Sequence, residues 1–294
     1  SPAARLYTEM LVAKAVIHGD RSKLLAYNRE ELPLALQLGG SEPKEMTSAA
    51  RYAEDAGFSE ININVGCPSN KVQSGDIGAC LMRVPETVAE CVRSISTEVN
   101  LPVTVKTRTG IDEIDDYEHL ANFIETVSSA GCSTFIIHAR KAWLKGLSPK
   151  QNRDVPALDY QRVYRLKEEN PHLQIILNGG IKTVDQVLQH RNHVDGVMIG
   201  REITRNPWLL SELKDTLDEN SSGPASRKEV QSEYDGYMQS ELASCTSVHA
   251  LVRPLSGLYH GMPGARQWRR MLSTMSQDKA AKVHDLPRSL SDFS

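Results

Sequence analysis

The sequence predicts a parallel α/β fold followed by a small helical domain, on three observations. Short, largely apolar runs rich in β-branched residues alternate with amphipathic helical patterns through the first two thirds of the chain. This alternation stops after Leu210, and the later apolar residues follow a helical spacing. The length of 294 residues accommodates one barrel-sized domain and a smaller one. Repeated strand–helix units imply parallel strands joined by right-handed crossovers.

Seven runs have the length and composition of buried strands. They cover residues 5–9, 33–37, 61–65, 103–107, 134–138, 174–178 and 196–199. Pro33 is compatible with a strand because it is the first residue of its run. An eight-stranded barrel needs one strand more. We therefore expect either an open sheet or a sequence that begins one βα unit late.

Two helices between these strands have clear signals. Residues 84–99 place five apolar residues on one helix face, at spacings of four, four, three and four. These are Val84, Val88, Val92, Ile95 and Val99. Ser41 is expected to cap an earlier helix that carries Pro43 in its first turn.

The same patterns predict the domain boundaries. Residues 1–215 are expected to form the barrel domain and residues 228–276 the helical domain. Residues 216–227 contain a run of serine, glycine and proline that predicts a linker. Residues 277–294 have little periodicity and are expected to fray.

Composition excludes several classes of protein. No apolar run approaches the roughly 20 residues that cross a bilayer, so no membrane partner is predicted. Five cysteines without a CxxC pair argue against a disulfide framework, and no group of residues has the spacing of a metal site. The net charge is only −3, yet residues 201–247 carry −4 and residues 248–294 carry +4. This asymmetry indicates either a basic binding surface near the C-terminus or a solvated charged face.

Polar residues follow nearly every predicted strand. They are Gln37, Asn64, Lys106 with Arg108, His138 with Arg140, Asn178 with Gly179 and Gly180, and Gly200 with Arg201. Each one alone could satisfy a loop or be a hydrogen-bonded core residue. Together they predict a ligand site, because chemistry in a βα barrel gathers at the carboxyl ends of the strands.

The last two strand ends indicate a phosphorylated ligand. The Gly179–Gly180 pair lets the backbone approach a ligand closely, and Gly200 with Arg201 adds an N–H group and a forked cation. Lys106 could stabilise the negative charge of a reduced flavin, and Gln37 could bind the polar edge of its ring. The alternative for Lys106 is an ion pair with a carboxylate.

Residues 64–82 form the most distinctive segment, a glycine-punctuated loop between a strand and a helix. Cys67 lies just past the strand and is expected to be structural. Cys80 lies on a loop that could overhang the barrel mouth, where a protonated thiol can donate a proton. The residues alone leave a second interpretation equally open, that Cys80 is a small buried hydrophobe.

This segment, NVGCPSNKVQSGDIGACLM, resembles the signature of the tRNA-dihydrouridine synthases. The resemblance continues through ALQLGG, VKTRTGID, LNGGI and IGRE, and extends to about residue 275. The motifs HARKAWLKGLSPKQNR and GARQWRR are similar to those of the A subgroup, which acts on D-loop uridines at tRNA positions 20 and 20a.

The resemblance implies a (β/α)8 TIM-type barrel that holds FMN and a helical domain that binds tRNA. It implies that NADPH reduces the flavin, that hydride passes to C6 of a flipped-out uracil, and that Cys80 protonates C5. The implied FMN contacts are Gln37, Lys106, His138, Asn178, Gly179, Gly180, Gly200 and Arg201. The implied tRNA contacts are Ile77, Lys150, Gln151, Arg153, Arg266 and Arg269.

The arginines beside Trp268, namely Arg266, Arg269 and Arg270, predict a basic–aromatic patch for RNA. The alternative is that Trp268 packs into its own domain and the arginines are merely solvated.

The family begins with one more strand and a flavin-contacting loop, so the match starts at the expected second strand. A first alternative function is therefore a truncated, inactive tRNA-binding member, and a second is another FMN barrel oxidoreductase acting on a small molecule. The expected location is the cytoplasm, or a plastid or mitochondrion if an address precedes the chain.

Overall fold

The computed structural model describes residues 4–69, 75–217, 226–243 and 247–277. Most of the predicted linker, Cys245 and nearly all of the predicted tail lie outside these residues. Contacts divide the chain into two compact units, which are described separately. The first comprises residues 1–180 and 187–198, and the second comprises residues 181–186 and 199–294.

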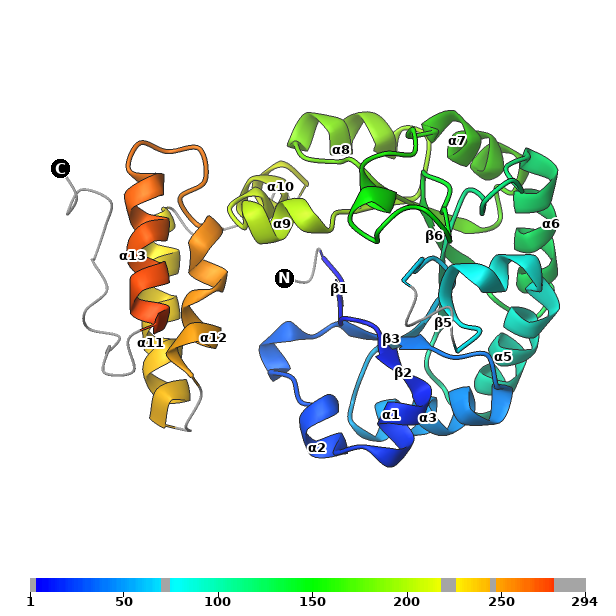
Figure 1. Cartoon of the computed structure of the whole chain (residues 1–294), viewed down its shortest axis with the longest axis horizontal. Helices are drawn as coiled ribbons and strands as arrows, with labels where there is room; N and C mark the ends of the chain where they lie inside the picture. The colour runs from blue at the N-terminus through cyan, green and yellow to red at the C-terminus, as the bar shows by residue number, and fades with distance from the viewer. Residues whose placement is uncertain (1–3, 70–74, 218–225, 244–246, 278–294) are drawn as a thin grey trace. The chain divides into compact units, whose positions relative to one another are not determined.

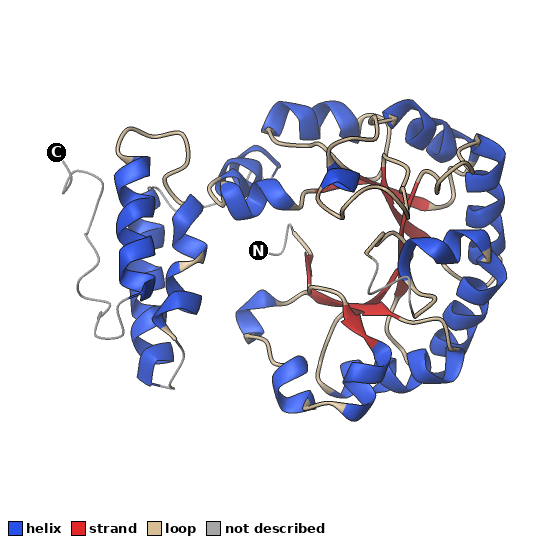
Figure 2. Ribbon diagram, viewed as in Figure 1, coloured by secondary structure: helices blue, strands red, loops and turns tan. Residues whose placement is uncertain are grey.

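The first unit is a curled parallel sheet with helices along its outer face (Figures 1 and 2). The strands follow the order β1–β3–β4–β5–β6–β7–β8, and β2 also pairs with β3. They are β1 (Leu6–Tyr7), β2 (Leu11–Val12), β3 (Leu34–Gly39), β4 (Glu60–Asn64), β5 (Val103–Arg108), β6 (Thr134–His138), β7 (Gln174–Asn178) and β8 (Gly196–Met198). The predicted parallel α/β class, with a helical part after it, is confirmed.

The prediction of a single strand over residues 5–9 is wrong. Two short strands, β1 and β2, pair with successive parts of β3. Between them the side chain of Thr8 interrupts the ladder, because its Oγ1 accepts the backbone N–H of Gln37 at 3.0 Å. A side-chain oxygen thus occupies a position where a continuous ladder presents a backbone carbonyl.

In the described part of the chain, seven helices accompany the sheet. They are α1 (Ala13–His18), α2 (Arg21–Leu24), α3 (Pro43–Asp55), α5 (Pro85–Glu98), α6 (Tyr117–Ser128), α7 (Tyr160–Glu169) and α8 (Val184–Arg191). The interaction of α3 with α5 and of α5 with α6 builds the outer layer visible in Figure 1.

Two predicted helix starts are corrected, and both corrections have the same cause. Val84 is not on the buried face of α5: it is 44% exposed and is the N-cap residue. The N-cap of α3 is Glu42 rather than Ser41. In each case proline occupies the first helical position, where its fixed φ suits the helix while its ring keeps the preceding residue out of helical conformation.

The sheet carries aliphatic side chains on one face and polar ones on the other. In β4, Ile61 and Ile63 alternate with Glu60, Asn62 and Asn64, as the pleat of a strand requires. Glu60 is 1% exposed and Asn62 is 0% exposed, so these polar groups need internal partners. Their partners are polar groups of neighbouring strands. The same polar face carries further polar side chains at the carboxyl ends of the strands.

The second unit has its own hydrophobic core. It contains α9 (Arg201–Arg205), α10 (Leu209–Leu217), α11 (Arg227–Ala243), α12 (Val248–Val252) and α13 (Ala265–Gln277). Trp268 is fully buried among Met238, Leu255 and Leu272, and its Nε1 donates to the carbonyl of Leu255 at 2.8 Å. Trp268 is therefore a core residue, as one of the two interpretations held. No helix among the described residues is long and apolar enough to cross a membrane.

Replacement of Trp268 by alanine is expected to destabilise the second unit by about 3–5 kcal/mol, because it leaves a large cavity and removes the indole hydrogen bond to the Leu255 carbonyl. Urea unfolding followed by circular dichroism measures this change. Ser273→Ala, an exposed position on the same helix, is the control. Equal unfolding midpoints for the two variants would contradict the central place of Trp268.

Candidate functional site

Side chains from four strands meet at the carboxyl ends of the sheet. The amide of Gln37 in β3 donates to Asn62 Oδ1 at 2.8 Å and accepts from Asn64 Nδ2 at 2.7 Å. Lys106 in β5 donates from Nζ to Asn178 Oδ1 in β7 at 3.2 Å. The structure thus brings together the residues that the sequence placed at separate strand ends.

Gln37 has a fixed orientation because its amide belongs to a chain of hydrogen bonds that continues into the buried interior. Asn62 donates from Nδ2 to Thr104 Oγ1 at 2.8 Å, and Thr104 donates to Glu60 Oε1 at 2.6 Å. The carboxylate of Glu60 can only accept, so each donor and acceptor in the chain has one assignment. Arg5 pairs with the same carboxylate.

The backbone after β7 forms a cradle that only glycine permits. Gly179 has φ of 119° and Gly180 has φ of 74°, a region that L side chains rarely adopt. A Cβ on Gly179 would lie 2.7 Å from His138 Cδ2, and one on Gly180 would lie 2.6 Å from Leu158 Cδ1. Tyr160 donates to the Gly179 carbonyl at 2.8 Å and holds the turn. The turn therefore keeps bare backbone beside His138.

Lys106 carries a positive charge that is poorly solvated. Burial, assisted by repulsion from Arg108, lowers the pKa of Lys106 to about 8. Within the described residues no carboxylate pairs with it, so the ion pair that was the alternative for Lys106 is not formed. A group with negative charge would stabilise this ammonium and be stabilised by it.

Arg108 joins the loop after β4 to two points of the loop between β6 and α7. Its Nε donates to Gly66 O at 2.8 Å, and its Nη1 donates to Lys141 O and Asn152 O, each at 3.0 Å. The residue is 3% exposed. Burial lowers the pKa of Arg108 to about 10, which still leaves it charged near neutral pH. The three carbonyls compensate part of the cost of burying the guanidinium.

Cys80 lies in the 3-10 turn Gly78–Arg83, which is attached to the end of β4. Ala79 donates its N–H to Cys67 O at 3.0 Å, and Asn64 Oδ1 accepts the N–H of Cys67 at 3.0 Å. The thiol of Cys80 is half-buried and donates to Ile77 O at 3.1 Å. Burial, and then the charge of Asp76, raises the pKa of Cys80, so the thiol stays protonated at neutral pH.

Asp112 connects the Cys80 turn to the loop after β6. Its Oδ2 pairs with Arg83 Nη2 at 2.5 Å, and its Oδ1 accepts the N–H of Leu144 at 2.8 Å. Asp112 has a φ of 50°, which is uncommon for a residue other than glycine. Such a backbone conformation persists where the surrounding contacts determine it.

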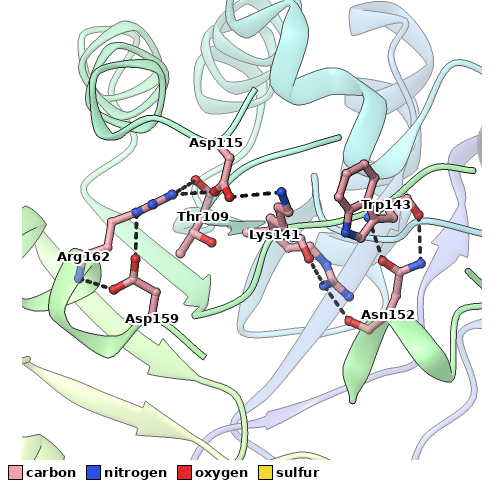
Figure 3. Close-up of polar contacts among 8 residues, drawn as sticks. Thr109, Asp115, Lys141, Trp143, Asn152, Asp159 and Arg162 are labelled. Carbon is pink, nitrogen blue, oxygen red and sulfur yellow. Dashed lines mark hydrogen bonds and ion pairs between the residues drawn. The ribbon is translucent and has the colours of Figure 1, made fainter. Parts of the chain in front are cut away.

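Asn152 organises the loop between β6 and α7. It is 0% exposed, and its side chain accepts from Trp143 N at 2.7 Å and donates to Trp143 O at 2.8 Å (Figure 3). The neighbouring residues Lys150, Gln151 and Arg153 are exposed. The buried amide therefore fixes a short turn that presents three polar side chains outward.

An ion-pair network supports the same loop. Asp115 pairs with Arg162 Nη1 at 2.7 Å and with Lys141 Nζ at 3.2 Å, and Arg162 Nε pairs with Asp159 at 3.0 Å (Figure 3). Lys141 also lies over the ring of Trp143, 4.3 Å from its centroid. Several charges in one network hold geometry better than isolated surface pairs do.

Four of the remaining predicted residues belong to the second unit. Gly200 caps α9, and Arg201 is the first residue of that helix. Arg266 and Arg269 lie exposed on α13, on either side of the buried Trp268 in the sequence. Ile77, which was expected to contact tRNA, belongs to the first unit and is 6% exposed.

The roles of three supporting residues are not predicted by the sequence. Arg108 was recognised only as a polar strand end, and Asp112 and Asn152 were not singled out. Their roles depend on backbone groups of distant loops, which residue types do not reveal. The adjacency of Asn152 to Lys150 and Arg153 was the one available signal.

A curled parallel sheet with polar groups at its strand ends defines an enzyme of the TIM-type α/β barrel class. The sequence matches the dihydrouridine synthase (Dus) family over residues 1–291. The chain belongs to this family, whose members are flavin-dependent oxidoreductases that reduce uridine in tRNA.

The match extends to individual relatives over nearly the whole chain. The chain is 50% identical to the tRNA-dihydrouridine(20/20a) synthase of Shewanella oneidensis over 283 residues, 96% of this chain and 84% of the relative. It is 49% identical to the proteins of the same name from Vibrio cholerae and Escherichia coli K12 over 97% of this chain, covering 87% and 83% of those proteins. Identity at this level disfavours both alternatives, the inactive tRNA-binding member and the small-molecule oxidoreductase.

Asn152→Ala is expected to loosen the loop between β6 and α7, because it leaves both backbone groups of Trp143 without their partner. The expected loss of stability is about 2–3 kcal/mol, with faster proteolysis within residues 143–153. Urea unfolding and limited proteolysis measure the two effects. Asn170→Ala is the matched control, because it removes one amide hydrogen bond at the end of α7. Identical behaviour of the two variants would show that Asn152 does not organise the loop.

Proposed function

We propose that this chain reduces uridines at positions 20 and 20a of the tRNA D-loop to dihydrouridine, with FMN as its flavin and NADPH as the reductant. The relatives that carry this substrate in their names support the two positions. The observation that carries the proposal is the cluster at the strand ends, where a buried ammonium and a glycine turn lie at the carboxyl ends of the sheet to which the turn of the protonated Cys80 thiol is attached.

The residues at the strand ends fit a phosphorylated flavin. The backbone at Gly179 and Gly180 has positive φ and packs directly against His138 and Leu158, and successive N–H groups in such a turn can form an anion-binding nest. Lys106 supplies an unneutralised positive charge. The proposed contacts with FMN are Gln37, Lys106, His138, Asn178, Gly179, Gly180, Gly200 and Arg201. When bound, FMN accepts hydride from NADPH and supplies hydride to C6 of the uracil.

Cys80 is the proposed general acid that protonates C5 of the uracil. Its raised pKa keeps the proton on sulfur at neutral pH, and its turn is attached to the strand end through Ala79 and Cys67. The target base must leave its stack to reach such a site, so the RNA must be held in a defined register. The proposed tRNA contacts are Ile77, Lys150, Gln151, Arg153, Arg266 and Arg269.

The proposed role of each part of the chain is the one that the sequence predicts. We propose that residues 1–215 bind the flavin, that residues 228–276 bind tRNA, and that residues 216–227 connect them. The relatives compared are bacterial proteins, and they give no support to an organellar address. A compartment that contains tRNA, such as the bacterial cytoplasm, suits the proposed substrate.

Cys80→Ala is expected to retain FMN and to be reduced by NADPH, but to form dihydrouridine at least about 100-fold more slowly, because general acid catalysis contributes about 10²–10⁴-fold. Flavin absorbance, stopped-flow reduction and dihydrouridine mapping of tRNA measure the three steps. Cys67→Ala, a thiol in the same segment, is the control. A wild-type dihydrouridine yield from Cys80→Ala would remove the acid role.

The affinity for FMN is expected to fall as pH rises above about 8. Below that pH Lys106 is protonated and attracts the anionic ligand, and above it the ammonium is lost. FMN binding raises the pKa of Lys106, so binding takes up a proton near pH 8–9. Flavin fluorescence titrations at pH 7, 8 and 9 measure the effect. Lys106→Gln is expected to bind more weakly with little pH dependence, and an unchanged pH dependence in that variant would contradict the assignment.

A further inference from the structure

The second unit contains a broad cavity that none of the predicted contacts explains as a whole. It has a volume of about 770 Å³, within the range of about 300–1,000 Å³ that ligand sites occupy. Its walls come from the end of α9, the turn Pro254–Gly257, the segment 260–264 and the first half of α13. All four belong to the same compact unit.

The ionisable side chains that line the cavity are all basic. Arg205, Arg266, Arg269 and His260 line it, and no acidic residue does. Within the described residues none of the three arginines forms an ion pair. Between residues 248 and 277 the sequence contains four arginines and no aspartate or glutamate. A group of unneutralised cations around a cavity attracts a polyanion.

Tight packing holds the walls of the cavity in place. A Cβ on Gly257 would lie 2.5 Å from Arg205 O and 2.8 Å from Pro207 Cδ, so the backbones of these two segments touch. Trp268 fixes α13 to the same turn through its hydrogen bond with Leu255 O at 2.8 Å. Arg227 Nε donates to Leu258 O at 2.9 Å, which anchors α11 beside it. The arginines therefore stand on a rigid support, which lowers the entropic cost of binding.

We propose that this cavity seats a sugar–phosphate segment of the tRNA substrate, with Arg205 and His260 as contacts in addition to Arg266 and Arg269. This inference rests on the proposed function and extends its RNA contacts to α9. Arginine suits the role because its planar fork binds phosphate oxygens in pairs. Met262, 40% exposed on the rim, offers apolar surface to a ribose.

The test compares tRNA affinity across a salt series for the full chain and single variants. Arg205→Ala is expected to bind tRNA about tenfold more weakly, as the loss of a charged hydrogen bond predicts. It is also expected to lower the slope of log affinity against log salt concentration by about 0.7–0.9, which is the change that the loss of one phosphate contact produces. Arg205→Lys is expected to retain the slope, and His260→Ala to weaken binding. Flavin content and flavin reduction by NADPH are expected to stay unchanged.

Arg253→Ala is the matched control, because Arg253 is an exposed arginine of the same unit outside the cavity. If Arg205→Ala matches Arg253→Ala in affinity and slope while Arg266→Ala and Arg269→Ala weaken binding, RNA contacts only the α13 wall, the proposal that the cavity seats it is wrong, and the proposed function stands. If the wild-type chain neither binds tRNA nor forms dihydrouridine, both proposals fail. Chemical modification of the cavity arginines can be compared in the presence of inorganic phosphate and of tRNA. If both ligands protect the arginines equally, the cavity is not a seat specific for RNA.

Discussion

The buried guanidinium of Arg108 is the interaction on which the arrangement of the candidate site depends. A charged group at 3% exposure needs hydrogen-bond partners, since an unsatisfied buried charge costs several kcal/mol. Here the partners are three carbonyls from two loops, Gly66 after β4 and both Lys141 and Asn152 between β6 and α7. The first leads to the turn of Cys80 and the third to the loop that presents Lys150 and Arg153. The hydrogen bonds of the Arg108 guanidinium therefore position both the proposed acid and the proposed RNA contacts.

The polar face of the sheet is also held in one arrangement by its hydrogen bonds. Glu60 can only accept hydrogen bonds, and this fixes in turn Thr104, Asn62 and the amide of Gln37. A site built in this way loses little entropy when it binds a ligand, because its polar groups are already oriented. The remaining positive charge of Lys106 has no carboxylate partner within the described residues, so the site is electrostatically incomplete without an anion.

The second unit uses charge differently. Its arginines stand exposed around a cavity whose walls are fixed by apolar packing at Trp268 and by backbone contact at Gly257. Interactions of this kind are long-ranged and salt-dependent, and they suit the capture of a polyanion. The mouth of the barrel, in contrast, buries its cations, where they are screened little and act over short distances.

The sequence by itself determined the parallel α/β class, the helical unit and most of the strand ends, because pleat alternation, helical spacing and the placement of glycine are local properties. It also identified Cys80 and Lys106 through motifs. It misplaced the starts of α3 and α5, where proline makes the preceding residue a cap, and it extended β1 over Thr8 and Glu9 and missed β2. Only the tertiary structure decided that Arg108, Asp112 and Asn152 hold the loops and that Trp268 packs inward while its flanking arginines face outward. These contacts join residues distant in the chain, so no local pattern encodes them.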